Sequence, residues 1–363
     1  MNSFASRIIR WQRQHGRHTL PWQSVVVDDL SSLQPRPTPC GQGSHDAYRI
    51  WLSEIMLQQT QVATVIPYFE RFLARFPSLP LLAEAHEDEV LALWSGLGYY
   101  SRARNLHAAA RIVAEKHGGQ FPAALDDISR LPGVGRSTAA AVAALAFGQR
   151  CAILDGNVKR VLARHGGISG WTGDKKIEAA LWQLAEARLP AASIEAYTQG
   201  MMDLGASICS RNQPACHRCP VSADCIAHTR HRTAELPTPR PKKVLPEKQI
   251  QMLLLIDRGE IFLEKRPARG IWGGLWSLPE LDFNADPVAH CLLHFGVGTL
   301  EQQPWAQLAH SFTHFKLEIQ ATRLHPATRP PAQPGQIWLS KASALDAALP
   351  APIRKLVLMT EHA

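Results

Sequence analysis

The chain has 363 residues, of which 45% are hydrophobic and 19% charged. This composition is typical of a globular protein and excludes a disordered chain. No apolar run reaches the ~18 residues that a membrane-spanning helix needs, so we expect no membrane association. The formal net charge of +8 favours a polyanionic partner such as nucleic acid, but charge alone does not identify one.

The N-terminus is basic and has no acidic residue before Asp28. A mitochondrial transit peptide has such a composition, but so does a basic first helix that ends near Trp22, and we favour the helix. The first residues also lack the apolar core of a secretory signal. We therefore expect a cytoplasmic bacterial protein.

Hydrophobic spacing divides the chain into three parts. Residues 1–228 are dominated by apolar residues at three- and four-residue intervals, which predicts helices; Pro67 is expected to end or kink one of them. Residues 229–249 are basic and rich in proline, as in a linker. Residues 250–363 begin with two β-patterned segments around Gly259, which predicts a hairpin in a smaller α/β domain. The predicted fold class is α+β and multidomain.

Four of the seven cysteines lie close together, in the spacing Cys209-x6-Cys216-x2-Cys219-x5-Cys225. One tight cluster in a chain without a secretion signal indicates a metal site and not a disulfide framework. Four thiolates can enclose either a zinc ion or an iron–sulfur cluster, and the spacing alone leaves both open. Four unrelated buried thiols are the least favoured alternative.

A Leu-Pro-Gly-Val-Gly segment at 131–135 separates two predicted helices. Gly133 and Gly135 permit positive φ and close backbone approach, and the N–H groups at the start of the next helix can hold an anion. This arrangement suits a phosphate contact that ignores base sequence. The alternative is an ordinary turn between helices.

Two acidic residues occupy unusual positions. Glu54 shares a helix face with Ile50, Trp51 and Leu57. Burial there would raise its pKa towards neutrality, whereas a glutamate at the helix rim would keep its head in water. Asp155 follows an apolar segment and suits an N-cap, which would keep it ionised. A protonated glutamate facing an ionised aspartate is the usual pair for cleaving a glycosidic bond.

Several motifs, at residues 53–62, 96–100, 131–139 and 154–158 together with the four cysteines, resemble the adenine DNA glycosylases of the MutY type. This family belongs to the helix-hairpin-helix superfamily, which also contains endonuclease III. The resemblance implies that Glu54 protonates a flipped adenine and that Asp155 stabilises the sugar cation. It implies a [4Fe-4S] cluster on the cysteines. It also implies a monomer acting on duplex DNA with A:8-oxoguanine or A:G mispairs.

The same resemblance assigns DNA contacts. Gln59 and Tyr99 match residues that wedge into the base stack, and Trp22 and Gln199 match positions of the base pocket. Gly133, Gly135 and Ser137 belong to the DNA-binding turn. Ser137 stands where endonuclease III relatives carry a lysine that forms a Schiff base, so a monofunctional enzyme is expected.

The C-terminal part resembles the family's nudix-like recognition domain. Gly274 and Glu280 have the spacing that opens a nudix box, but the Arg-Glu and Glu-Glu pairs that should follow are missing, so no nucleotide hydrolysis is expected. The segment Phe312-Thr313-His314 aligns with a Phe-Ser-His loop that senses the oxidised guanine. Threonine for serine is one departure from the family. The other is the long stretch at residues 25–45, which receives no role.

Two rival functions remain at this stage. One is an enzyme of the same superfamily that acts on damaged pyrimidines and has lyase activity; Ser137 and the C-terminal domain argue against it. The other is a non-catalytic DNA-binding protein whose cluster senses redox state. Base excision by the wild type and by Glu54→Gln discriminates this second rival from a glycosylase. A wild type that excises no base would favour the DNA-binding protein.

Overall fold

The structure, a computed structural model, describes residues 3–23, 46–241 and 244–362. The long stretch at residues 25–45 lies outside these described ranges. The chain divides into two compact units. The first comprises Met1–Ala83 and Ala108–Lys242, and the second comprises Glu84–His107 and Lys243–Ala363. The predicted boundaries at 228 and 250 stay a prediction.

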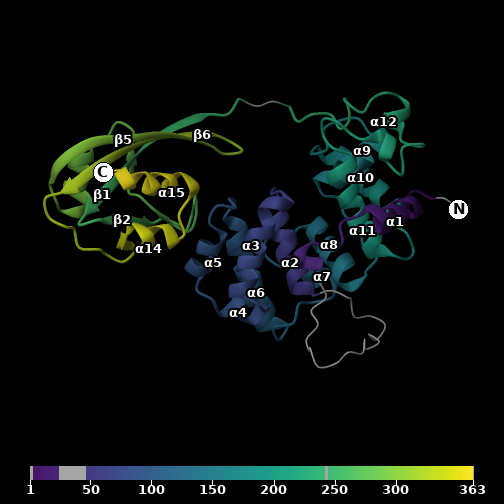
Figure 1. Ribbon diagram of the computed structural model, residues 1–363, viewed down its shortest axis with the longest axis horizontal. Coiled ribbons are helices and arrows are strands. Elements are labelled where there is room, and N and C mark those ends of the chain that lie inside the picture. The colour runs from purple at the N-terminus through teal and green to yellow at the C-terminus, as the bar shows by residue number, and fades with distance from the viewer. Residues whose placement is uncertain (1–2, 24–45, 242–243, 363) are drawn as a thin grey trace. The chain divides into compact units, whose positions relative to one another are not determined.

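The first unit is helical (Figure 1). Its larger helices are α1 (Phe4–His15), α2 (Ala47–Leu57), α3 (Val62–Arg75), α8 (Arg136–Phe147), α9 (Gly156–Gly166), α10 (Lys175–Ala187) and α11 (Ile194–Asp203). Shorter elements are η1 (Pro21–Gln23), α4 (Leu79–Glu84), α7 (Leu125–Ser129), η2 (Leu204–Ile208), η3 (Cys216–Arg218) and α12 (Ile226–Thr229). The mainly helical N-terminal part predicted from the sequence is confirmed.

Side-chain caps fix where several of these helices begin. Asp46 accepts hydrogen bonds from the backbone N–H groups of Tyr48 and Arg49 at the start of α2, and Asp174 caps α10 in the same way. Such caps satisfy N–H groups that have no partner inside the helix. Pro67 was expected to end or kink a helix; it does not end one, because α3 runs through this residue, and the kink stays a prediction. The chain breaks earlier, between α2 and α3, where Gln59 adopts a φ of +60°.

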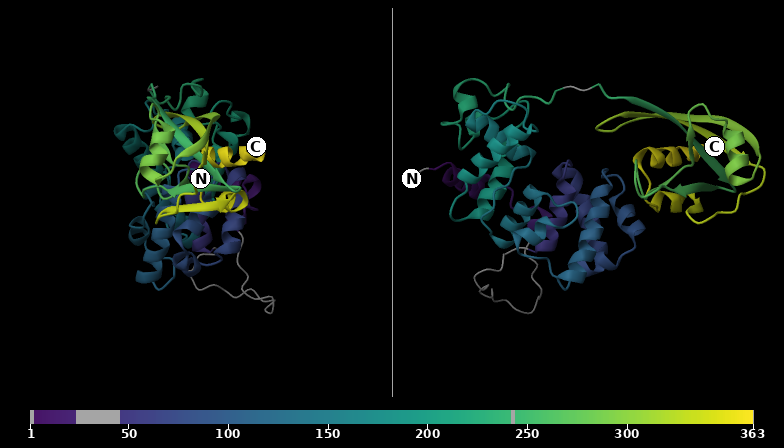
Figure 2. Two further views of the ribbon diagram at one scale, coloured as in Figure 1. Left: turned by 90° about the vertical axis from the view of Figure 1, so that its left-hand side faces the viewer. Right: turned by 180° about the vertical axis from the view of Figure 1, so that it is seen from behind.

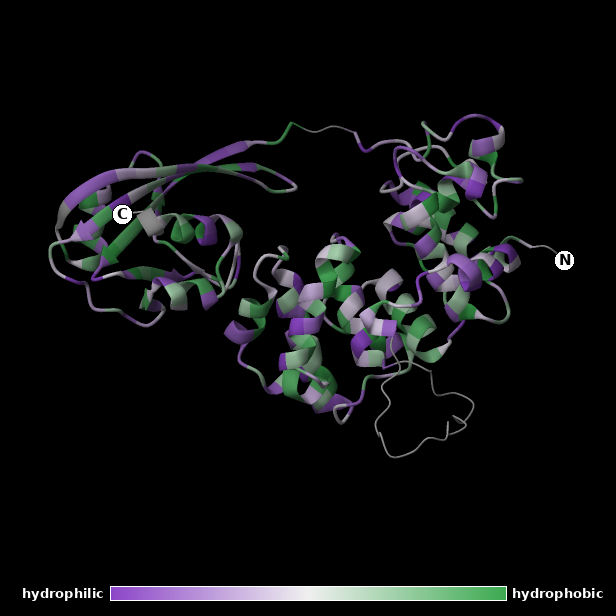
Figure 3. Cartoon of the chain, viewed as in Figure 1, coloured by the Kyte–Doolittle hydropathy of each residue, from purple (hydrophilic) through white to green (hydrophobic). Residues whose placement is uncertain are grey.

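The alanine-rich helix α8 is the centre of the first unit. All eight residues from 139 to 146 are buried, which small side chains allow because neighbouring helices can approach closely. Ala140 and Ala141 pack into one apolar cluster with Ile153, Leu154 and Val158. Figure 3 shows that the surrounding helices carry both hydrophobic and hydrophilic residues, as expected for helices with one face in a core.

The second unit combines a sheet with helices α5 (Glu87–Trp94), α13 (Pro287–Phe295), α14 (Lys341–Asp346) and α15 (Ala351–Leu358). Its strands are β1 (Glu247–Asp257), β2 (Glu260–Lys265), β3 (Trp276–Ser277), β4 (Glu280–Asp282), β5 (Thr299–Ser311), β6 (Lys316–Pro326) and β7 (Gln336–Ser340). The helix α6 (Ser101–Lys116) begins in this unit and ends in the first.

The sheet has the strand order β3-β2-β1-β6-β5, with β4 pairing to β1 and β7 to β2. Strands β1 and β6 are parallel, and β5 and β6 form a long antiparallel pair that is visible in Figure 2. The predicted hairpin is confirmed: Asp257 pairs with Glu260, and Arg258 and Gly259 both have positive φ in the turn. Among the described residues, no helix has the length and apolar character to cross a bilayer.

Candidate active site

Glu54 lies on α2 among buried neighbours. Trp51 and Ile55 on the same helix are almost fully buried, and Glu54 itself is half-buried. Burial, and to a smaller extent the negative charge of Asp155, raise the pKa of Glu54 to about 8. A carboxyl group with this pKa holds its proton at neutral pH and can donate it.

Asp155 caps α9, as its sequence context predicts. Its carboxylate accepts a hydrogen bond of 2.7 Å from the backbone N–H of Val158. Burial raises the pKa of Asp155, while the N–H groups of Val158 and Asn157 and the charges of Arg160 and Lys159 act against that rise. These groups stabilise the charged form of Asp155. Its carboxylate in turn raises the pKa of Glu54, so Asp155 is the first of the two to ionise.

Ser137 positions the segment that carries Asp155. Its hydroxyl oxygen accepts a hydrogen bond of 2.9 Å from the backbone N–H of Leu154. Leu154 precedes Asp155 directly and is buried. The bond therefore holds the backbone next to Asp155 against the first turn of α8. A lysine ammonium has donors only and could not accept this bond.

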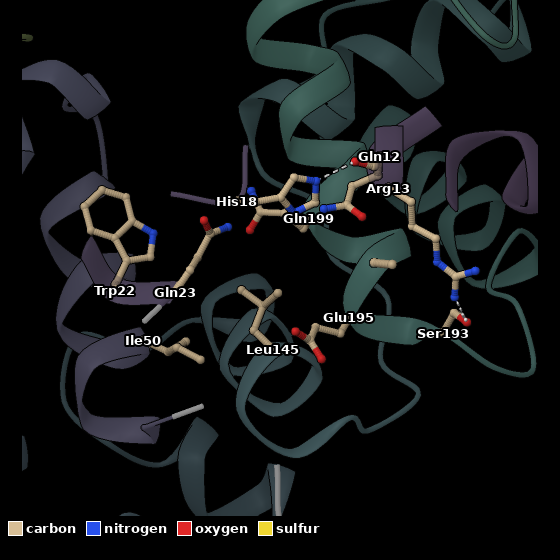
Figure 4. Close-up of a pocket in the computed structure, with 11 residues that line it drawn as sticks. Gln12, Arg13, His18, Trp22, Gln23, Ile50, Leu145, Ser193, Glu195 and Gln199 are labelled. Carbon is tan, nitrogen blue, oxygen red and sulfur yellow. Dashed lines mark hydrogen bonds between the residues drawn. The ribbon is translucent and has the colours of Figure 1, made fainter. Parts of the chain in front are cut away.

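A cavity of about 310 Å³ opens between α1, η1, α2, α8 and α11 (Figure 4). It is lined by Trp22 and Gln199, the two residues assigned to a base pocket from the sequence, and by Ile50, one helical turn before Glu54. The remaining lining residues are Gln12, Arg13, His18, Gln23, Leu145, Ser193, Glu195 and Ala196. The structure therefore brings the two predicted pocket residues together beside the helix face that carries Glu54.

The turn at residues 131–135 joins α7 to α8. Gly133 has a φ of +76°, a conformation that glycine adopts without steric cost, and Gly135 is the N-cap of α8. Within the part of the chain that the structure describes, no side chain caps this helix start, so the N–H groups of its first turn are available to an external anion. Both glycines are exposed.

Gln59 and Tyr99 are exposed residues that both have positive φ, +60° and +48°. Non-glycine residues rarely adopt this conformation, and such strain is concentrated at functional sites. Tyr99 is 45% exposed, although aromatic rings are usually buried. The backbone thus presents a glutamine and an aromatic ring at the surface, each at a turn between helices.

The four cysteines of the cluster are partly buried and act on one another. Burial raises the pKa of the Cys219 thiol to about 12, with smaller contributions from Cys209, Cys225 and Cys216. Arg164, which is buried, donates to Cys209 Sγ at 3.4 Å and to the carbonyl oxygens of neighbouring loop residues. Across the described ranges, no three or more His, Cys, Asp or Glu side chains converge closely enough to hold a metal ion.

The second unit has a cavity of about 590 Å³ at the tip of the β5–β6 pair. Phe312, Thr313 and His314 line it together with Tyr99 and Trp272. Rings surround this space: Phe312 stacks on Phe315 with centroids 4.5 Å apart, and Trp272 lies 5.6 Å from Phe312. Aromatic faces with a few polar groups between them suit a planar ligand.

The residues with nudix-box spacing serve other contacts. Glu280 forms an ion pair of 2.7 Å with Arg266, which also donates to the carbonyl oxygen of Ile271. Gly274 has a φ of +76° in the turn that precedes β3. Glu280 is therefore paired within the fold and not grouped with further carboxylates.

Sequence reasoning missed several residues around the first cavity. Gln23 lines it, and its side chain bonds the backbone of Arg17 and Leu20. Asp203 contacts Gln199 from one helical turn away. The only signal in the sequence was this four-residue spacing, which is common on helices.

Two family models match successive parts of the chain. Residues 52–187 match the family model described as "HhH-GPD superfamily base excision DNA repair protein", and residues 251–359 match that of the NUDIX domain. An adenine DNA glycosylase of Buchnera aphidicola from Schizaphis graminum is 33% identical over 357 residues, covering 98% of this chain and 97% of the relative. A human adenine DNA glycosylase is 31% identical, covering 98% and 73%.

A solved structure is similar to the first part of the chain. The structure of a thermostable thymine-DNA glycosylase matches with a TM-score of 0.51 and 28% identity. The match covers 62% of this chain and 95% of that one. The helical architecture around Glu54 and Asp155 is thus shared with a known glycosylase.

Replacing Glu54 by glutamine is expected to change how stability depends on pH. The folded protein holds the Glu54 proton up to about pH 8, whereas an unfolded carboxyl loses it near its ordinary value of 4.5. Rising pH between these values therefore destabilises the wild type but not Glu54→Gln. The melting temperature of the variant minus that of the wild type should increase from pH 5 to pH 8 and stay constant at higher pH.

Thermal denaturation followed by circular dichroism measures this difference. Glu115→Gln, which changes an exposed glutamate of α6, is the control, and its difference from the wild type should stay constant across the range. A constant difference for Glu54→Gln as well would show that Glu54 is ionised in the folded protein.

Proposed function

This chain belongs to the adenine DNA glycosylase family, and we propose that it hydrolyses the N-glycosidic bond of adenine placed opposite 8-oxoguanine or guanine in duplex DNA. The observation that carries the proposal is the electrostatic pairing of Glu54 with Asp155, together with a cavity that Trp22 and Gln199 line along with Ile50, one helical turn before Glu54. One group holds a proton and the other a negative charge. Cleavage of a glycosidic bond requires both.

In the proposed reaction, the adenine leaves the base stack and enters the cavity of the first unit. Glu54 donates its proton to a ring nitrogen of the base, and the electrons of the breaking C1′–N bond remain with the base, which departs neutral. The sugar is left as an oxocarbenium ion. The anionic form of Asp155, stabilised by the α9 N–H groups, offsets this positive charge. Glu54, now ionised, accepts a proton from the water that attacks C1′.

Two features support the extrusion of a nucleotide. The uncapped start of α8 and the turn with Gly133 and Gly135 can hold a backbone phosphate. Gln59 and Tyr99 offer an amide and a ring that can fill the gap left in the stack, as their exposure and strained backbone suggest. Because these contacts do not read base edges, they hold the duplex at any sequence.

Recognition of the opposite base is assigned to the second unit. Its cavity combines aromatic rings with the hydroxyl of Thr313, which lies 3.3 Å from His314 Nδ1. An oxidised guanine differs from guanine by a carbonyl group at C8 and a hydrogen on N7. The hydroxyl of Thr313 can hydrogen-bond either group, so the threonine retains the recognition expected from serine.

The four cysteines are proposed to hold a [4Fe-4S] cluster. The chemistry of the donors fits, because four thiols lie within one loop region, three of them act electrostatically on Cys219, and Arg164 supplies positive charge beside Cys209. The described side chains do not converge on one point, so the cysteines would have to close around the cluster to bind it. A bound cluster would shape the loop around these residues. Base excision as described uses no electron from it.

Ser137 makes the enzyme monofunctional in this proposal. It carries no amine, and its oxygen is already engaged with the backbone of Leu154. The product should therefore be an intact strand with an abasic site, cut only after alkali treatment. Strand cleavage without alkali, together with a borohydride-trapped complex, would contradict this expectation.

We further propose that the enzyme acts as a monomer on chromosomal DNA in the bacterial cytoplasm. Both carboxyl groups and the cavity beside them come from one chain, so no second copy is needed to complete the site.

Asp155→Asn is expected to abolish turnover while leaving DNA binding largely intact. The asparagine oxygen can still cap α9, but the negative charge that offsets the sugar cation is lost. Single-turnover excision should fall by at least about a thousandfold. Fluorescence anisotropy with a duplex containing A opposite 8-oxoguanine measures binding. Loss of binding together with turnover would mean that Asp155 mainly caps its helix.

Thr313→Val is expected to reduce discrimination between 8-oxoguanine and guanine. Valine has the shape of threonine without the hydroxyl, so one hydrogen bond is lost at an exposed position. The ratio of adenine excision rates opposite 8-oxoguanine and opposite guanine should fall by roughly tenfold. Thr229→Val is the control, because that hydroxyl bonds only carbonyl oxygens of its own turn. An unchanged ratio for Thr313→Val would remove this residue from base recognition.

A further inference from the structure

Gln199 lines the cavity of the first unit and is 7% exposed. Its side-chain nitrogen donates a hydrogen bond of 2.9 Å to Asp203 Oδ1, one helical turn further along α11. Its carbonyl oxygen has no hydrogen-bond donor among the described residues. The end of the amide that is left for a ligand is therefore the oxygen. Figure 4 shows Gln199 between the groups that line the two ends of the cavity.

Asp203 is a buried carboxylate held on several sides. It is 2% exposed, and Arg17 Nε donates to its Oδ1 at 2.7 Å. A second guanidinium nitrogen of Arg17 lies 2.7 Å from the same oxygen, and the backbone N–H of Arg17 donates to Oδ2 at 2.9 Å. A buried carboxylate needs such compensation, and the bonds from Arg17 hold it in place as an acceptor.

An ionised carboxylate can only accept hydrogen bonds, so the amide of Gln199 can turn only its nitrogen towards Asp203. The opposite rotamer would place two oxygens against each other. Gln23, by contrast, has both ends of its amide engaged with the backbone of Leu20 and Arg17, so neither end is left for a ligand. The direction of the Gln199 amide is thus determined outside the cavity.

We propose that Asp203, held by Arg17, is a positioning residue that makes the cavity selective for a 6-aminopurine over a 6-oxopurine. The inference rests on the proposed function and adds the reason why the enzyme selects adenine over a 6-oxopurine. The carbonyl oxygen of Gln199 accepts a hydrogen bond from an exocyclic amino group. It repels a carbonyl oxygen at the same place. A site built to hydrogen-bond one group rejects an analogue that cannot make the bond.

The variant Asp203→Leu tests this proposal because it removes the constraint. The Gln199 nitrogen and the Arg17 guanidinium both donate to Asp203 Oδ1, so they lie next to each other once that oxygen is absent. A guanidinium has donors only, so Gln199 then turns its oxygen towards Arg17 and presents its amino group to the cavity. We expect adenine excision to fall by at least about tenfold and hypoxanthine excision to rise, so that their ratio changes by about a hundredfold.

Single-turnover excision is measured on duplexes that carry adenine, hypoxanthine or unsubstituted purine opposite 8-oxoguanine. Purine has neither donor nor acceptor at C6, so its rate should not change in Asp203→Leu. The matched control is Asp224→Leu, which removes another ion-paired carboxylate of the first unit, bonded to Arg7 and His165 and outside the cavity lining. The control should keep the wild-type ratio.

Loss of all three substrates by the same factor would mean that Asp203 only stabilises the fold, and this would overturn the proposal. An unchanged ratio of adenine to hypoxanthine would also overturn it. Binding of duplexes with the non-cleavable 2′-fluoro analogues of deoxyadenosine and deoxyinosine gives the same comparison without catalysis. If the wild type excises no adenine, the proposed function is wrong, and the order of these two affinities in wild type and variant still decides the role of Asp203.

Discussion

Two carboxyl groups that share a site with little water cannot both be charged without a large energetic cost. In the first unit, the two carboxyl groups have different surroundings, which favour the charged form of only one of them. Burial raises the pKa of both groups, but only Asp155 receives two backbone N–H groups and the charges of Arg160 and Lys159, which act against that rise. The proton therefore stays on Glu54. The helix start at α9 and the apolar face of α2 are the means by which the fold assigns different roles to two similar side chains.

The parts of the structure that depend on neighbouring residues could be predicted from the sequence. The cap at Asp155 follows from an apolar segment that ends at a Gly-Asn pair, and the hairpin at Arg258 and Gly259 from two β-patterned runs around a glycine. The mainly helical first part follows from hydrophobic spacing. In each case the interactions that determine the conformation lie within a few residues.

The parts that depend on distant residues could not be predicted in this way. Pro67 was expected to interrupt a helix, but the break occurs at Gln59, where the backbone takes up a left-handed conformation. The contact of Arg17 with Asp203 joins positions 186 residues apart. The assignment of residues 84–107 to the second unit likewise arises from packing, since α5 has an ordinary amphipathic sequence. No local pattern contains this information.

The same close packing limits how the sequence can vary over evolution. Gly205 in η2 lies against Asn157, so that a β-carbon at position 205 would stand only 2.6 Å from Cβ of Asn157. Asn157 follows Asp155 by two residues in the first turn of α9. Any larger side chain at 205 would push this turn, and the carboxylate that caps it, out of register with Glu54. A residue without a functional group is thus as intolerant of replacement as the acids themselves, and inherited changes there should impair the protein from a distance.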